Sequence, residues 1–170
     1  MPGTPETRNH GAGASLTSFC YAKDKNVATA KAAPNGAGDV WTWTAIDRDS
    51  KMILAFEVGD RSGATALDFM TDLRARLATR VRLTTDGHNA YLEAVEGAFG
   101  GDVDYAMLVK LYGDATGQKG HEKKYSPAEC TGAQGEVISG YPVKEVVSTS
   151  HVERQNLSMR MGLRRFTRFD

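Results

Sequence analysis

The alternation of apolar and polar positions predicts three strands early in the chain. The segment SLTSFCYA at 15–22 is typical of a short strand. Two further runs, VWTWTAID at 40–47 and MILAFEVG at 52–59, are rich in aromatic and β-branched residues. Only the short polar segment RDSK at 48–51 separates them. We therefore expect these two runs to form an antiparallel hairpin.

Helical and strand periodicities alternate after the hairpin. Residues 62–80 and 87–99 carry apolar side chains three or four positions apart, which predicts two amphipathic helices. A strand is predicted between them, VRLTTD at 81–86, and another after them, VDYAMLVKLY at 103–112. The hairpin thus leads into a helix–strand–helix unit followed by a further strand.

The remaining segments complete an α/β architecture. Residues 113–140 are rich in Gly, Lys and Ser and predict a long loop with room for one hairpin, and a final helix begins near residue 151. This order of elements predicts a mixed sheet with helices packed on it. Residues 1–14, rich in Gly, Pro and Thr, predict a disordered tail ahead of a single domain at 15–170.

Composition and charge narrow the class of protein. The formal net charge is zero, yet residues 151–170 are strongly basic and the acids concentrate in the middle of the chain. No run approaches about 18 apolar residues, so no membrane-spanning helix is expected. The N-terminus lacks the apolar core of a signal peptide. Cys20 and Cys130 fit no metal-binding spacing, which favours reduced thiols in a cytoplasmic protein.

Asp86 is the first candidate site residue. It ends an apolar strand and precedes Gly87, whose backbone can turn sharply into the next helix. Ligands of α/β proteins bind at the carboxyl ends of strands, so a carboxylate at this position is expected to face a crevice. Asp is also a favoured helix N-cap. The sequence around Asp86 therefore fits a ligand-binding carboxylate and a helix N-cap equally well.

Glu153 begins the final helix ahead of an arginine-rich stretch. With Ser150 it matches the S-x-x-E capping box, which would explain the acid by itself. Successive residues of a helix are about 100° apart, so two sets of residues lie on different sides of the final helix. The first set shares the side of Glu153, and the second set is apolar and is expected to dock on the core. The first set is Asn156, Leu157, Arg160, Arg164 and Arg168, and the apolar set is Val152, Met159, Leu163 and Phe166. A face that is basic after its first acid, and that points away from the core, indicates contact with phosphate groups.

Other polar and aromatic residues give weaker signals. Asp47 ends the strand at 40–47 and is a secondary candidate for a metal ligand, although a hairpin turn formed by Asp47 explains it more simply. No spacing of His or Cys predicts a zinc site. Trp41 and Trp43 lie on one face of their strand and are predicted to be in the core.

Two longer motifs follow one another along the chain, LTTDGHNAYLEAVEGAFG at 83–100 and STSHVERQNLSMRMGLRRFTR at 148–168. In this order they resemble motifs of the DDE transposases of bacterial insertion sequences, most of all the insertion sequence one type. The segments GDVWTWTAID and KYSPAEC also agree with that family. The likeness runs from about residue 18 to residue 168. It implies an RNase H-like fold, a mixed five-stranded sheet with an antiparallel hairpin and flanking helices, and a DNA transposase catalytic core.

The resemblance assigns roles to particular residues. The second carboxylate of the family falls on Asp86 and the third on Glu153. Intact members would hold two Mg²⁺ or Mn²⁺ ions about 3.5–4 Å apart, and would cleave and join transposon-end and target DNA at this site. The residues implied to contact DNA, through backbone phosphates and without reading bases, are Arg154, Asn156, Arg160, Arg164, Arg165 and Arg168.

The first carboxylate of the family is missing. The family motif D-E-x-W-S-F-V aligns its last three places with residues 18–20, which puts Ala14 at the Asp place, Ser15 at the Glu place and Thr17 at the Trp place. By the same resemblance, we expect this chain to be a fragment that begins after the family's upstream DNA-binding module and stops before its closing helical segment.

We therefore expect a transposase remnant with impaired activity. By resemblance, it would associate with the bacterial nucleoid and with further copies of itself. Two alternatives are a metal-dependent nuclease of RNase H-like fold and a non-catalytic DNA-binding remnant.

Overall fold

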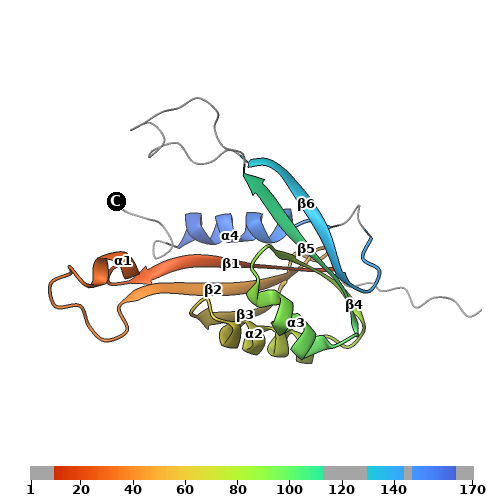
Figure 1. Ribbon diagram of the computed structural model, residues 1–170, viewed down its shortest axis with the longest axis horizontal. Coiled ribbons are helices and arrows are strands. Elements are labelled where there is room, and N and C mark those ends of the chain that lie inside the picture. The colour runs from red at the N-terminus through yellow and green to blue at the C-terminus, as the bar shows by residue number, and fades with distance from the viewer. Residues whose placement is uncertain (1–9, 113–129, 144–146, 164–170) are drawn as a thin grey trace, which may run out of the picture.

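A six-stranded mixed sheet with helices on both faces forms the protein (Figure 1). The computed structural model describes residues 10–112, 130–143 and 147–163. Its elements are β1 (His10–Cys20), α1 (Asp24–Val27), β2 (Gly38–Asp47), β3 (Ile53–Gly59), α2 (Gly63–Arg76), β4 (Val81–Asp86), α3 (Ala90–Phe99), β5 (Val103–Tyr112), β6 (Cys130–Ser139) and α4 (Ser150–Gly162). The α/β class and mixed sheet predicted from the sequence are confirmed.

The strand order is β3-β2-β1-β4-β5-β6. The first three strands pair antiparallel, and the hairpin expected between β2 and β3 is present. β4 then lies parallel to β1, β5 lies parallel to β4, and β6 returns antiparallel to β5. The carboxyl end of β4 therefore lies in the middle of the sheet, with β1 on one side and β5 on the other.

Two segments differ from the prediction. β1 begins at His10, so residues 10–14 belong to the sheet and not to a disordered tail. Residues 130–139 form the edge strand β6, within the segment where a long loop with room for one hairpin was expected. Both segments are rich in small residues with low strand propensity, and pairing with neighbouring strands outweighs that local preference. Residues 1–9 and 113–129 lie outside the described part of the chain.

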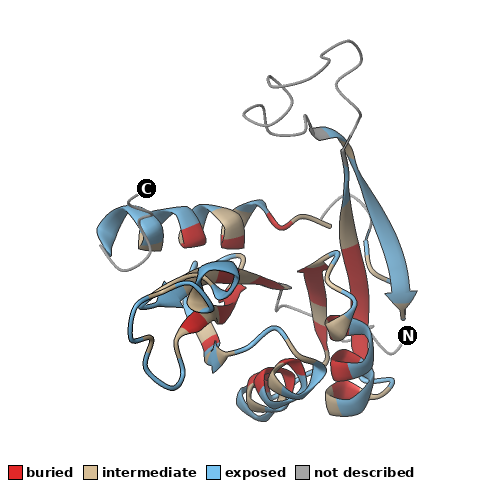
Figure 2. Cartoon of the chain, turned by 60° about the vertical axis from the view of Figure 1, so that its left-hand side comes forward, coloured by how far each residue is buried: buried red, intermediate tan, exposed pale blue. Residues whose placement is uncertain are grey.

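The main core lies between the sheet and the helix pair α2 and α3 (Figure 2). Both predicted helical stripes are confirmed at their centres, where Ala66, Phe69, Met70, Leu73, Tyr91, Ala94 and Val95 are buried. Trp43 is 0% exposed and packs against Phe69 and Tyr91. Trp41 is only partly buried, and the guanidinium of Arg61 lies 4.5 Å from the centroid of its ring.

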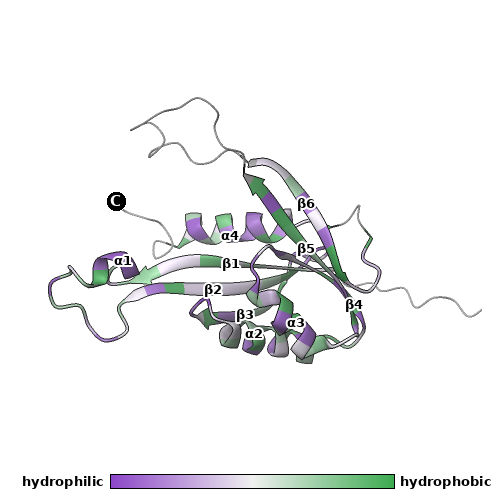
Figure 3. Cartoon of the chain, viewed as in Figure 1, coloured by the Kyte–Doolittle hydropathy of each residue, from purple (hydrophilic) through white to green (hydrophobic). Residues whose placement is uncertain are grey.

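Helix α4 covers the opposite face of the sheet. Hydrophilic and hydrophobic residues alternate along it (Figure 3), and its buried residues are Val152 and Asn156. Val152 forms a second buried cluster with Ala12 and Ala14 of β1 and Ile46 of β2. Leu163 was predicted to dock on the core but is 51% exposed, because the helix ends at Gly162. Phe166 lies outside the described residues.

None of the helices in the described ranges is long and apolar enough to cross a membrane.

Candidate functional site

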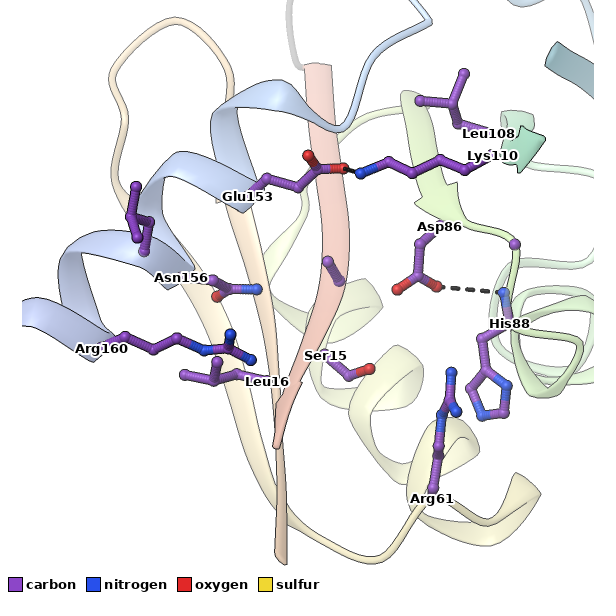
Figure 4. A pocket seen from close by; sticks show the side chains of 13 residues that line it. Ser15, Leu16, Arg61, Asp86, His88, Leu108, Lys110, Glu153, Asn156 and Arg160 are labelled. Carbon is purple, nitrogen blue, oxygen red and sulfur yellow. Dashed lines mark hydrogen bonds and ion pairs between the residues drawn. The ribbon is translucent and has the colours of Figure 1, made fainter. Parts of the chain in front are cut away.

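A pocket of about 490 Å³ opens between the end of β4, the middle of β1 and helix α4 (Figure 4). It contains both acids singled out in the sequence, Asp86 and Glu153, although they lie far apart along the chain. The full lining is Ala14, Ser15, Leu16, Arg61, Asp86, Gly87, His88, Leu108, Lys110, Glu153, Asn156, Leu157 and Arg160. Asp86 and Glu153 therefore line the same pocket.

Asp86 faces the pocket from the last position of β4. Its carboxylate accepts a hydrogen bond from the backbone N–H of His88 at 3.3 Å. Helix α3 begins only at Ala90, with Asn89 as its N-cap, so Asp86 does not cap this helix. Burial raises the pKa of Asp86, and the hydrogen bond from His88 and the positive charge of Arg61 offset only part of that rise.

Ala14 lies beside Asp86 on the neighbouring strand. The parallel ladder of β1 and β4 runs as far as Gly13 opposite Thr85, so the next step sets Ala14 against Asp86. Ala14 lines the pocket. The position to which the resemblance assigns the first carboxylate thus contributes a methyl group to the site.

Glu153 enters the pocket from the first turn of α4. One of its carboxylate oxygens, Oε1, accepts a hydrogen bond from the Thr149 hydroxyl at 2.6 Å and lies 2.9 Å from the ammonium of Lys110. Burial alone would raise the pKa of Glu153, but these two contacts outweigh it, and the pKa lies below its usual value. The predicted capping box is not formed, because Thr149 is the N-cap and Ser150 is already helical.

The polar side of α4 faces the pocket and the sheet, whereas the sequence suggested that it points away from the core. Asn156 is buried, and its side-chain carbonyl accepts a hydrogen bond from the Thr44 hydroxyl at 3.1 Å. Arg160 lines the pocket one turn further along. Arg154 is exposed and does not line it. The other predicted DNA-contacting residues, Arg164, Arg165 and Arg168, lie outside the described residues.

Asp47 lies away from the pocket. It accepts hydrogen bonds from the backbone N–H and hydroxyl of Ser50, at 2.9 and 2.5 Å, which confirms the turn interpretation. It pairs with Gly11, three positions before Ala14 on β1. Three steps of a strand span about 10 Å, so Asp47 is too far along the sheet to replace a carboxylate at Ala14.

Two cations of the pocket, Arg61 and Lys110, were not identified from the sequence. Lys110 lies two positions beyond Leu108 on β5, and strand alternation puts both side chains on one face. That alternation was a usable signal, but nothing in the sequence shows that β5 lies beside β4. Arg61 comes from the segment between β3 and α2, and its place beside His88 and Asp86 depends on the tertiary structure.

The pocket does not fit the two metal ions that the resemblance implies. Within the described ranges, no group of three or more His, Cys, Asp or Glu side chains could hold a metal ion. The lining has two carboxylates and three Arg or Lys side chains, and one of those carboxylates already pairs with Lys110. Divalent cations such as Mg²⁺ require oxygen ligands, and neighbouring positive charges oppose their binding.

Comparison of this chain with known proteins does not assign it to a family. No protein-family model matches the chain, and no curated protein matches it. Among solved structures, an endonuclease V from Bacillus subtilis is similar at 13% identity and a TM-score of 0.32. The similarity covers 60% of this chain and 45% of that chain, so this chain spans less than half of that protein's length. A likeness at this level assigns neither fold nor function.

The two acids of the pocket are expected to affect stability in opposite directions. Because burial raises the pKa of Asp86 above its ordinary 3.8, the folded protein holds this proton more tightly than the unfolded chain does. Its contribution to stability therefore falls as the pH rises from about 3.8 through the folded pKa. The pKa of Glu153 is lowered from 4.5, so its contribution is present above that pH and is lost on acidification.

We expect Asp86→Asn to raise the free energy of unfolding at pH 7, and Glu153→Gln to lower it. Both differences from the wild type should shrink as the pH falls toward 3, because acidification protonates Asp86 and Glu153 and makes them resemble the neutral amides. Urea denaturation between pH 3 and pH 8 measures both effects. A shift in the same direction for the two variants at pH 7 would contradict the assigned environments.

Proposed function

We propose that this chain is the catalytic core of a DDE-type transposase, of the insertion sequence one type, that binds DNA but has impaired strand cleavage. The observation that carries the proposal is the meeting of Asp86, Glu153 and Arg160 in one pocket. The motif resemblance assigns the same three residues to one site.

The sheet supports the proposal of an RNase H-like fold. Strands β1 to β5 form a mixed sheet that contains an antiparallel hairpin, β2 with β3, and these are the features that the resemblance implies. β6 adds a sixth strand at the edge next to β5, away from the hairpin. The two candidate acids then come from the end of the central strand β4 and from a helix on the face opposite α2 and α3.

The position of Ala14 supports impaired cleavage. A two-metal site needs carboxylates from several elements to hold both ions, and here the position beside Asp86 is an alanine. The chain therefore keeps two of the three proposed ligands, together with the basic residues around them. This favours the non-catalytic DNA-binding remnant as the second candidate function. The nuclease alternative differs in its reaction, because a nuclease would hydrolyse DNA without joining it to a target.

DNA is the proposed partner because basic side chains outnumber acidic ones in the lining of the pocket. Arg61, Lys110 and Arg160 come from three separate segments of the chain and line the same crevice. Arg side chains suit phosphate groups, which they can bind through two hydrogen bonds at once. Such contacts position a nucleic acid without reading its sequence. Recognition of transposon ends and self-association remain predictions from the resemblance.

Arg160→Gln is expected to weaken DNA binding more than Arg154→Gln does. The two arginines lie on the same helix, but only Arg160 lines the pocket. Loss of one phosphate contact should reduce the slope of log K against log salt by about 1, equally for all DNA sequences. Fluorescence anisotropy with a labelled duplex, in EDTA and between 50 and 200 mM salt, measures this slope.

Lys25→Gln is the matched control, because it removes one positive charge from the exposed helix α1, away from the pocket. Its slope should equal that of the wild type. Equal losses of DNA affinity and salt slope in the Arg154 and Arg160 variants would show that DNA does not bind at the pocket. Absence of any salt-dependent DNA binding by the wild type would refute the proposed function.

A further inference from the structure

Lys110 forms an ion pair with Glu153, the carboxylate that the resemblance assigns to a metal ion. Its ammonium lies 2.9 Å from Glu153 Oε1, and the side chains are 40% and 41% exposed. Figure 4 shows the lysine extended across the pocket toward the first turn of α4. We propose that Lys110 acts as an internal cation that excludes divalent metal ions from Glu153.

The position of Lys110 follows from the unequal lengths of two neighbouring strands. β4 ends at Asp86, which pairs with Leu108, whereas β5 continues to Tyr112. Lys110 therefore lies just past the end of β4, on the same face as Leu108. No residue of β4 separates its side chain from α4, and the lysine can cross the open end of the strand to reach Glu153.

A lysine and a metal ion at Glu153 exclude each other on electrostatic grounds. Mg²⁺ bound to Oε1 would lie about 2.1 Å from this oxygen. Since the ammonium is 2.9 Å from the same oxygen, the two cations would be at most about 5 Å apart, where they repel. The Thr149 hydroxyl also donates to Oε1. A metal ion must therefore displace Lys110 before it can use Glu153.

The rest of the pocket does not compensate for this competition. Asp86 is the other carboxylate of the lining, and Arg61 and Arg160 add further positive charge. Removing the charge of Lys110 would leave two acids and two arginines there, with Glu153 released from its ion pair. This inference concerns cation binding alone and does not require that the protein acts on DNA.

Titration of the full chain with Mn²⁺, followed by the electron paramagnetic resonance signal of the unbound ion, tests the inference. Lys110→Met and Lys110→Gln should bind Mn²⁺ tighter than the wild type by up to about fivefold, which corresponds to the upper range for a partly exposed ion pair. Lys110→Arg should match the wild type, because it keeps the charge. Lys25→Met changes net charge equally, away from the pocket, and should also match the wild type.

A second substitution identifies the carboxylate involved. Adding Glu153→Gln to Lys110→Met should return Mn²⁺ affinity to the wild-type value. The inference is overturned if folded Lys110→Met and Lys110→Gln show no gain, or if the gain survives the loss of Glu153. The substituted side chain is partly exposed, and circular dichroism verifies that each variant is folded. DNA binding in EDTA is a separate readout, so failure here leaves the proposed function standing.

Discussion

Ala14→Asp is expected to produce Mg²⁺-dependent nicking of supercoiled plasmid DNA, at least roughly a hundredfold above the wild-type level. The substitution places a carboxylate beside Asp86 and across the pocket from Glu153. Three acids would then face one crevice, the number that two-metal cleavage requires in the proposed family. Conversion of supercoiled to open-circular plasmid, with and without EDTA, measures the gain.

Ala12→Asp is the matched control for this gain. Ala12 and Ala14 lie on the same face of β1 and are each 4% exposed, but Ala12 does not line the pocket. Ala14→Asp should be destabilised in EDTA and should recover in Mg²⁺, whereas Ala12→Asp should be destabilised in both. This follows because a buried carboxylate is costly unless a cation or hydrogen bonds compensate it.

The gain has a clear opposing outcome. A folded Ala14→Asp protein that neither binds Mn²⁺ more tightly nor nicks DNA would count against the position assigned to the first carboxylate. The triple variant with Ser15→Glu and Thr17→Trp added restores the D-E-x-W part of the family motif and should be no less active. Adding Lys110→Met to Ala14→Asp should raise nicking further, because a metal ion at the restored site would no longer have to displace Lys110 from Glu153.

Trp43→Ala is expected to have the largest effect on stability, with a loss of about 3–5 kcal/mol in the free energy of unfolding. Trp43 is 0% exposed, and its ring packs on Phe69, His88 and Tyr91. Removal leaves a cavity under the segment that positions Asp86, so the pocket should also be disturbed. Urea denaturation measures the loss, and a protein already unfolded in water agrees with it.

Trp41→Ala provides a matched comparison on the same strand. This ring is partly buried against the core and contacts Arg61, so a cost of about 1–2 kcal/mol is expected. Similar losses for Trp41 and Trp43 would show that the core does not centre on Trp43.

Local sequence pattern was enough to locate most elements of the sheet and helices. β4 and β5 were predicted with the bounds that they have, and the buried stripes of α2 and α3 follow the spacing of their apolar residues. The spacing of apolar residues shows which side of a helix or strand packs on the core, and this spacing can be read from residues a few positions apart in the sequence. The start of β1 and the whole of β6 were missed, because their strand structure depends on pairing partners elsewhere in the chain.

The residues of the candidate site also divide into those that local sequence identified and those whose place only the structure shows. Asp86 and Glu153 were identified from motifs that surround each of them in the sequence. Asp47 was a reasonable candidate by the same kind of reasoning, yet its place opposite Gly11 removes it from the pocket. Asn156 was assigned to DNA, but its buried hydrogen bond with Thr44 gives it a part in docking α4.

The sequence by itself determined the α/β class, the hairpin, the two core helices and the two acids, because these depend on short-range patterns of residue type. Only the tertiary structure decided that Ala14 lies beside Asp86 and that Lys110 reaches Glu153. Both contacts result from strand register and from the unequal ends of β4 and β5, and no local pattern encodes the alignment of strands that are distant in the chain.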